Sequence, residues 1–221
     1  MSIFDKWAWI KRNWTYILED AHELDLVFVG GTALNLVLFK EYRASEDVDL
    51  YDPQAKNIGT SHEKECVEKL ANRLTEKGFE TRSKDARSFF IGPNIKVEVF
   101  NDGTSFTKIE KRTIDQMEVL TFDLDTCAKM KMKALLCRSV YDARDLVDLF
   151  VIKKQAGIDA TFPNLDCDII ENSFDERLNE IRRTKKADLL IFQTGDQIDA
   201  LPYKEFEEYK GWLYDWLSGF R

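Results

Sequence analysis

The chain has 221 residues and a mass of 25.8 kDa, with 44% hydrophobic and 33% charged residues. This balance describes a globular protein with one core, or one core followed by a helical extension. The formal net charge of −8 argues against broad electrostatic binding to nucleic acid, while leaving room for a local basic groove. No apolar run approaches the length of a membrane span and the first residues show no signal-peptide pattern, so we expect a cytoplasmic protein without a membrane partner.

The N-terminal segment predicts an amphipathic helix. Ser2, followed by Asp5, is typical of a helix N-terminus. Apolar residues then recur at steps of three and four positions, which predicts a stripe packed on the core. These residues are Ile3, Trp7, Ile10, Trp14 and Ile17.

A strand, a glycine turn and a helix follow in direct succession. The β-branched and aromatic residues of Leu26–Val29 predict a buried strand. Gly30 and Gly31 end it and allow the backbone to approach a ligand closely. Thr32 is expected to be the helix N-cap and a hydroxyl donor to a phosphate, and the first amides of Ala33–Phe39 would face that anion.

Two aspartates lie on the next predicted strand. Asp47 and Asp49 share one face, while Val48 and Leu50 share the other. Neighbouring carboxylates repel each other, and a hard divalent cation such as Mg²⁺ would relieve that repulsion. The alternative is an ordinary αβ hairpin that carries two solvated aspartates.

The middle of the chain changes from helical to strand periodicity. A helix is expected from Ser61 to Lys77, because Val67, Leu70, Ala71 and Leu74 would face inward. Strands are then predicted at Phe79–Ser83, at Arg87–Ile91, at Ile95–Phe100 and within Thr113–Phe122.

Glu98 is a third candidate carboxylate. If its strand pairs beside Val48–Leu50 with the apolar faces aligned, Glu98 emerges on the same side as Asp47 and Asp49. Three carboxylates would hold one or two Mg²⁺ ions, with Glu98 as a ligand or a general base. The alternative is a solvated glutamate paired with a neighbouring lysine.

The C-terminal half is predicted to be helical, with helices at Leu124–Cys137, Ala143–Gln155 and Tyr203–Leu217. We therefore expect an α/β core over residues 1–122 and a helical region over residues 123–221. The cysteines are scattered and only His22 and His62 accompany them, so no zinc site is predicted.

Charged residues of this half suggest a phosphate contact. Lys133 could reach phosphates, while Arg138, about 140° away around a helix, would bind something else or cap the helix end. Asp145 and Asp148 share a face and repel each other unless cations lie nearby. Arg144 with Asp148 could also be a simple surface ion pair.

The series GGTAL, SEDVDLY, Lys133 with Arg138, and RDLVDLF resembles the AbiEii-type nucleotidyltransferase toxins of bacterial abortive-infection and toxin–antitoxin systems. This family lies in the polymerase-β-like nucleotidyltransferase superfamily, and the resemblance covers roughly residues 26–155. It implies a small mixed sheet with flanking helices, followed by a helical C-terminal region. It also implies transfer of a nucleoside monophosphate from an NTP, with Mg²⁺ or alternatively Mn²⁺, to a tRNA 3′ end, and an antitoxin partner.

The resemblance also implies roles for individual residues. The phosphate-binding turn would be Gly30, Gly31 and Thr32, where the family more usually has Gly-Ser. The metal-binding segment would be Ser45, Asp47 and Asp49, joined by Glu98 in place of a more typical aspartate. The later motifs would be Lys133 with Arg138, and Arg144 with Asp145 and Asp148. Two other functions remain open. One is a degenerate nucleotide-binding or protein-interaction module, and the other is a transferase that acts on a protein or small-molecule hydroxyl.

Overall fold

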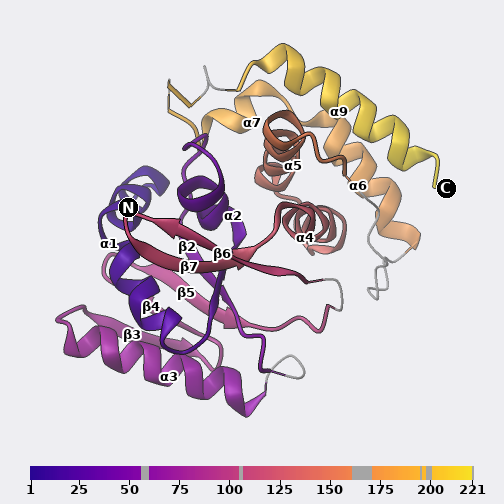
Figure 1. Cartoon of the computed structure of the whole chain (residues 1–221). Helices are drawn as coiled ribbons and strands as arrows, with labels where there is room; N and C mark the ends of the chain where they lie inside the picture. Colours follow the sequence, from indigo (N-terminus) through magenta and orange to yellow (C-terminus); the bar gives the residue numbers. More distant parts are fainter. Residues whose placement is uncertain (56–59, 105–106, 161–170, 195, 198–200, 221) are drawn as a thin grey trace. The chain divides into compact units, whose positions relative to one another are not determined.

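The computed structural model describes residues 1–55, 60–104, 107–160, 171–194, 196–197 and 201–220 (Figure 1). The chain divides into two compact units, Met1–Asp123 and Leu124–Arg221. Within the described ranges, no helix is both long enough and apolar enough to cross a membrane.

The first unit is a mixed sheet with flanking helices, as predicted. Its described strands form one sheet in the order β3-β4-β5-β2-β1-β7-β6. The pairs β2–β5 and β1–β7 are parallel, and the other neighbours are antiparallel. The elements are α1 (Ile3–His22), β1 (Val27–Val29), α2 (Gly30–Ala33), the π-helix η1 (Leu34–Leu38), β2 (Asp47–Tyr51), α3 (Ser61–Glu76), β3 (Thr81–Asp85), β4 (Ser88–Ile91), β5 (Ile95–Phe100), β6 (Ile109–Ile114) and β7 (Met117–Phe122).

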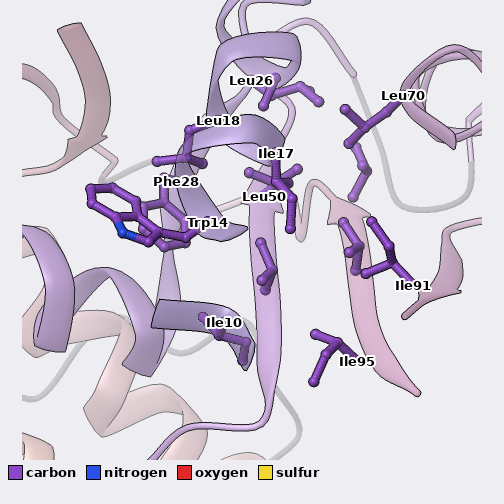
Figure 2. Close-up of a cluster of buried hydrophobic side chains, with 14 of the residues drawn as sticks. Ile10, Trp14, Ile17, Leu18, Leu26, Phe28, Leu50, Leu70, Ile91 and Ile95 are labelled. Carbon is purple, nitrogen blue, oxygen red and sulfur yellow. The ribbon is translucent and has the colours of Figure 1, made fainter. Parts of the chain in front are cut away.

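Helices α1 and α3 cover one face of this sheet (Figure 1). Helix α1 begins at the predicted place, because Ser2 and Asp5 form a reciprocal capping box. Its apolar stripe packs on the strands, and Figure 2 shows side chains of α1 beside those of the sheet. Members of this core include Ile10, Trp14, Ile17, Phe28, Leu50, Leu70, Ile91 and Ile95.

Strands β2 and β5 divide their side chains between this core and the opposite face of the sheet. Val48 and Leu50 on β2, like Val97 and Val99 on β5, are at most 1% exposed. Asp47 and Asp49 on β2, like Lys96 and Glu98 on β5, are only half-buried. Burial of the apolar side therefore holds the polar residues of both strands on the same, more accessible face.

Three local features differ from the prediction. The strand predicted within Thr113–Phe122 is β7, but it forms a hairpin with β6, which was not predicted; the hairpin turns at Asp115 and Gln116, which both have positive φ angles. Thr32 is not the N-cap; helix α2 begins at Gly30, and Val29 is its N-cap. The helix expected at Ala33–Phe39 is a π-helix, in which the Phe39 amide donates to the Leu34 carbonyl.

The second unit is helical. Helix α5 has Asp142 as its N-cap and ends at Gly157, which has φ +71°. The T-shaped ring contact between Phe150 and Phe206 joins α5 to the last helix. Its described helices are α4 (Leu124–Cys137), α5 (Ala143–Ala156), α6 (Glu171–Arg183), α7 (Lys186–Leu190) and α9 (Tyr203–Ser218).

Candidate active site

Strand pairing places the three candidate carboxylates together. In the parallel register of β2 and β5, Asp49 lies directly opposite Glu98, and Asp47 lies opposite Lys96. All four residues belong to the polar face of their strands, away from the buried valines and leucine. The sheet therefore presents three carboxylates and one ammonium group side by side, a charge pattern that attracts a cation.

Lys96 is already paired within this cluster. Its Nζ lies 2.6 Å from Glu98 Oε2. Burial disfavours the charged lysine, but the hydrogen bond to Glu98 and the charges of Glu98, Asp49 and Asp47 outweigh burial and raise the pKa of Lys96. Glu98 thus has the lysine partner named as its alternative, and it also lies beside Asp49. The sequence signal for Lys96 was its place two residues before Glu98, on the same strand face.

Gly30 is required by the position of Asp49. Gly30 has φ +75°, and a Cβ atom built on it would lie 2.3 Å from Asp49 Oδ2. Any side chain here would therefore be strained and would also displace the carboxylate. The first glycine of the turn lets the backbone touch the acid that follows it by 19 positions.

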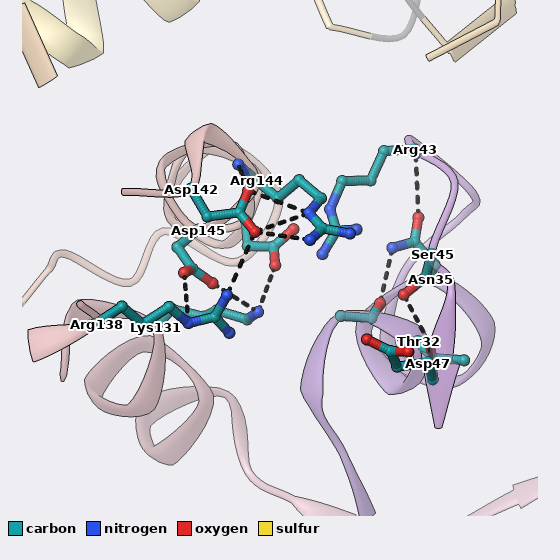
Figure 3. Close-up of polar contacts among 12 residues, drawn as sticks. Thr32, Asn35, Arg43, Ser45, Asp47, Lys131, Arg138, Asp142, Arg144 and Asp145 are labelled. Atoms are coloured by element: carbon teal, nitrogen blue, oxygen red, sulfur yellow. Dashed lines mark hydrogen bonds and ion pairs between the residues drawn. The ribbon is translucent and has the colours of Figure 1, made fainter. Parts of the chain in front are cut away.

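Gly31 makes room for a buried arginine that the sequence analysis did not single out. A Cβ atom on Gly31 would lie 2.0 Å from Arg43 Nη2, and Arg43 is only 2% exposed. Asn35 Nδ2 donates to the Gly31 carbonyl at 2.8 Å, while Asn35 Oδ1 accepts from the amides of Tyr42 and Arg43. This network joins the glycine turn to the segment before β2 (Figure 3). Arg43 lies outside the predicted helices and strands, so no apolar periodicity in the sequence indicated that it is buried.

Thr32 and Ser45 connect the same two segments through their hydroxyl groups. Thr32 Oγ1 hydrogen-bonds with Ser45 Oγ at 2.7 Å and donates to the main-chain carbonyl of Asp47 (Figure 3). Both residues are buried, with Thr32 at 0% exposure. The threonine hydroxyl therefore fixes helix α2 to the start of the acid-bearing strand.

The second unit contains a buried ion-pair network around Lys131. Its Nζ lies 2.7 Å from Asp148 Oδ2 and 3.0 Å from Asp145 Oδ1 (Figure 3). Asp145 and Asp148 are at most 1% exposed, and Lys131 is 8% exposed. Lys131 on α4 is thus the cation that allows two like charges to share one face of α5.

Two arginines surround this network. Arg138 Nε lies 3.4 Å from Asp145 Oδ2, and Arg144 Nη2 lies 2.8 Å from Asp142 Oδ2. Burial raises the pKa of Asp142, but the hydrogen bonds and charge of Arg144, with a contribution from Arg138, outweigh it and hold that pKa below its usual value. Arg144 therefore pairs with Asp142, the N-cap residue of α5.

Lys133 lies on α4 two positions from Lys131 and is half-buried. Lys133 is the predicted phosphate contact, but the residue spacing also contains a signal for Lys131. Seven residues separate Lys131 from Arg138, which is almost two helical turns, so these two residues share a face. Both indeed lie near Asp145.

Comparison with known proteins identifies the family. The model of the nucleotidyl transferase AbiEii toxin family of type IV toxin–antitoxin systems matches residues 15–211. The chain also resembles the crystal structure of an antigenic nucleotidyltransferase-like protein from Paracoccidioides brasiliensis, with a TM-score of 0.43 and 19% identity over 63% of this chain and 74% of that one. It resembles the Megavirus polyadenylate synthase with a TM-score of 0.43 and 13% identity, over 82% of this chain and 37% of that one.

A search of curated proteins found no significant match. The family match alone spans most of the chain, including the glycine turn, the acid-bearing strands and the Lys131 network. The chain therefore belongs to the AbiEii family of nucleotidyltransferase toxins.

Proposed function

We propose that the polar face of β2 and β5 is the catalytic site, where a nucleoside monophosphate is moved from an NTP to an acceptor hydroxyl. The observation that carries this proposal is the grouping of Asp47, Asp49 and Glu98 on one face, with Asp49 Oδ2 against the backbone of Gly30. A triphosphate held at that turn would lie beside carboxylates that bind its counter-ion.

The donor set fits a hard divalent cation. Asp47, Asp49 and Glu98 offer only carboxylate oxygens, which suit Mg²⁺ and its substitute Mn²⁺. When bound, such an ion would neutralise the triphosphate and lower the pKa of the attacking hydroxyl. Glu98 would either ligate the ion, after exchanging its contact with Lys96, or accept the proton of the acceptor hydroxyl.

The glycine turn would bind phosphates mainly through its backbone. Amide groups of Gly30 and Gly31 are proposed to contact the β- and γ-phosphates, because neither residue has a side chain that would keep an oxygen atom away. Thr32 and Ser45 would act by holding this turn against β2 through their mutual hydrogen bond. Arg43, packed against Gly31, would keep a positive charge close to the same backbone.

In the second unit, Asp145 and Asp148 are proposed as positioning residues for Lys131. Both carboxylates are buried and contact Lys131, and Asp145 also contacts Arg138, so both acids would orient these cations. Lys133, Arg138 and Arg144 are proposed as nucleotide contacts, because each lies on or beside the helices that this network joins.

The proposed acceptor is a tRNA 3′ end, the proposed partner is an antitoxin protein, and the proposed location is the cytoplasm; each rests on family membership. The net charge of −8 favours a second candidate, a transferase that modifies a protein hydroxyl, since a protein acceptor needs no basic surface.

Labelling would separate these acceptors. Purified protein would be incubated with total RNA, cell protein, Mg²⁺ and each of four α-³²P-labelled NTPs. A labelled band of tRNA size, absent with the Asp47→Asn/Asp49→Asn variant, would identify the nucleotide and place the acceptor in RNA. Label on a protein band would support the second candidate, and label in neither pool would contradict both.

A further inference from the structure

A second group of potential metal ligands lies apart from the carboxylate face. It consists of Asp52, His62 and Cys66, here called the Asp52 cluster, and its three donor atoms all lie within 4.8 Å of one another. Asp52 directly follows β2, while His62 and Cys66 are four residues apart on α3 and so share one helix face. None of these side chains takes part in the proposed transfer reaction.

The donor atoms converge on one point. Asp52 Oδ2 lies 2.5 Å from His62 Nδ1, and Cys66 Sγ lies 3.7 Å from the same nitrogen. A nucleophilic Cys-His-Asp triad requires the thiol and the carboxylate to meet opposite nitrogens of the ring. Because both meet Nδ1 here, the arrangement does not fit a catalytic relay, whereas convergence is what a metal ion requires.

Asp52 is held in place by other contacts. Its Oδ1 accepts from the Gln54 amide at 2.9 Å and the Ala55 amide at 3.3 Å, and its own carbonyl accepts from Asn101 Nδ2 at 2.8 Å. Asp52 is 1% exposed and Cys66 is 4% exposed, whereas the His62 side chain is 37% exposed. These contacts turn Oδ2 toward His62, as outer hydrogen bonds orient the ligands of metal sites.

We propose that the Asp52 cluster binds a divalent transition metal, Zn²⁺ by preference, through Asp52 Oδ2, His62 Nδ1 and Cys66 Sγ. In a tetrahedral zinc site the metal–ligand bonds are about 2.0–2.3 Å long, so a nitrogen and a sulfur ligand lie roughly 3.5 Å apart. The Sγ–Nδ1 distance of 3.7 Å already fits this spacing. The Oδ2–Nδ1 distance must lengthen by about 1 Å, as the metal replaces the hydrogen bond between these atoms.

The chemistry of the ligands distinguishes this site from the carboxylate face. A nitrogen and a sulfur ligand favour zinc over magnesium, whereas Asp47, Asp49 and Glu98 offer oxygen alone. The partly exposed His62 leaves a fourth position that water can reach. No zinc site was predicted from the sequence, because this one combines a His-Cys pair at helical spacing with an aspartate on another element.

Cobalt spectroscopy of the full chain tests this proposal without any assay of nucleotidyl transfer. Co²⁺ added to metal-free protein should produce a thiolate-to-cobalt charge-transfer band that saturates at one equivalent and disappears on addition of Zn²⁺. Cys66→Ser should abolish the band, and His62→Gln should weaken Co²⁺ and Zn²⁺ binding by at least about 10-fold.

Two matched variants serve as controls. Cys127→Ser removes the other buried free thiol among the described residues, and His22→Gln removes the other histidine, so both should leave the band unchanged. A wild-type protein that shows no charge-transfer band overturns the proposal, whatever the variants do. So does a band that survives in Cys66→Ser protein with an unchanged melting temperature.

Discussion

Gly30 and Asp49 are in direct contact: a Cβ atom on Gly30 would lie 2.3 Å from Asp49 Oδ2. Asp49 lies on β2 and Gly30 directly follows β1, whose last residue, Val29, pairs with Asp49 in the antiparallel β1–β2 register. The contact joins two of the four motifs that carry the family resemblance. The glycine turn is therefore part of the carboxylate site and not only a strand terminus.

Gly30→Ala should disable the site as well as strain the backbone. The positive φ alone costs an alanine about 1–2 kcal/mol, and a displacement of Asp49 by about 1 Å would lower the transfer rate by roughly 100-fold. Gly78→Ala is the matched control, because Gly78 has φ +89° but no atom within 4 Å of its built Cβ. Stability should fall in both variants, and activity only in Gly30→Ala. Equal activities, measured with labelled NTP, would contradict the proposed contact.

Asp49→Asn should remove transfer while leaving the fold nearly intact. The amide keeps the size of the side chain but loses the charge that would bind the ion, so we expect a rate at least about 100-fold lower. The melting temperature should hardly change, since Asp49 lies on the accessible face of β2. Glu110→Gln on β6 is the control, because it also replaces a carboxylate by an amide in the same sheet. Glu110 lies in a surface ion pair with Arg112, so the rate should not change. Loss of folding together with activity would count against a metal-binding role.

Lys131→Met should destabilise the second unit strongly. It would leave Asp145 and Asp148 buried without their shared cation, at a cost of about 3–5 kcal/mol in the free energy of unfolding. Lys129→Met is the control on the same helix; Lys129 pairs with exposed Asp125, and such a pair contributes under about 1 kcal/mol. Urea unfolding would measure both, and similar losses would show that the network does not stabilise the unit as described.

Asp142→Asn should reveal a pH-dependent contribution to stability. The asparagine side chain can still cap α5, but it lacks the negative charge that attracts Arg144 and Arg138. Wild type should therefore be about 1 kcal/mol more stable than the variant at neutral pH. Since folding lowers the pKa of Asp142, this advantage is full above the ordinary value of 3.8 and shrinks as pH falls through the folded value. Urea unfolding at neutral and at acid pH would measure the stability difference between wild type and Asp142→Asn. If that difference is the same at both pH values, the ion pairing is contradicted.

The sequence predicted the elements whose residues face one core. Strand β5 and helix α4 have the predicted bounds, and the alternation in β2 correctly divided Asp49 from Leu50. These predictions succeeded because burial on one face leaves a periodic pattern in the sequence. The pairing of β5 beside β2, which the prediction stated only as a condition, is present, and the alternation then places Glu98 on the face of Asp47 and Asp49.

Features set by tertiary contact gave no such pattern. Strand β6 is at the edge of the sheet and mostly exposed, and its turn to β7 has no glycine. Burial of Arg43 depends on the absence of a Cβ on Gly31, which no local pattern reports. Lys131 and Lys133 lie two positions apart on α4 and point about 200° apart around the helix, and the partners on α5 decide which one is buried. Residues 161–170, where the sequence was irregular, lie outside the described structure.

Pyrophosphate release would report nucleotidyl transfer by the β2 and β5 site, whatever the acceptor is. The full chain would be mixed with each NTP and Mg²⁺ in the presence of total RNA and cell protein, beside the Asp47→Asn/Asp49→Asn variant. The account predicts that wild type releases pyrophosphate with at least one NTP, and that the variant releases none above background. Release at the same rate by both proteins, or no release by folded wild type with any NTP, would contradict a nucleotidyl-transfer site on β2 and β5.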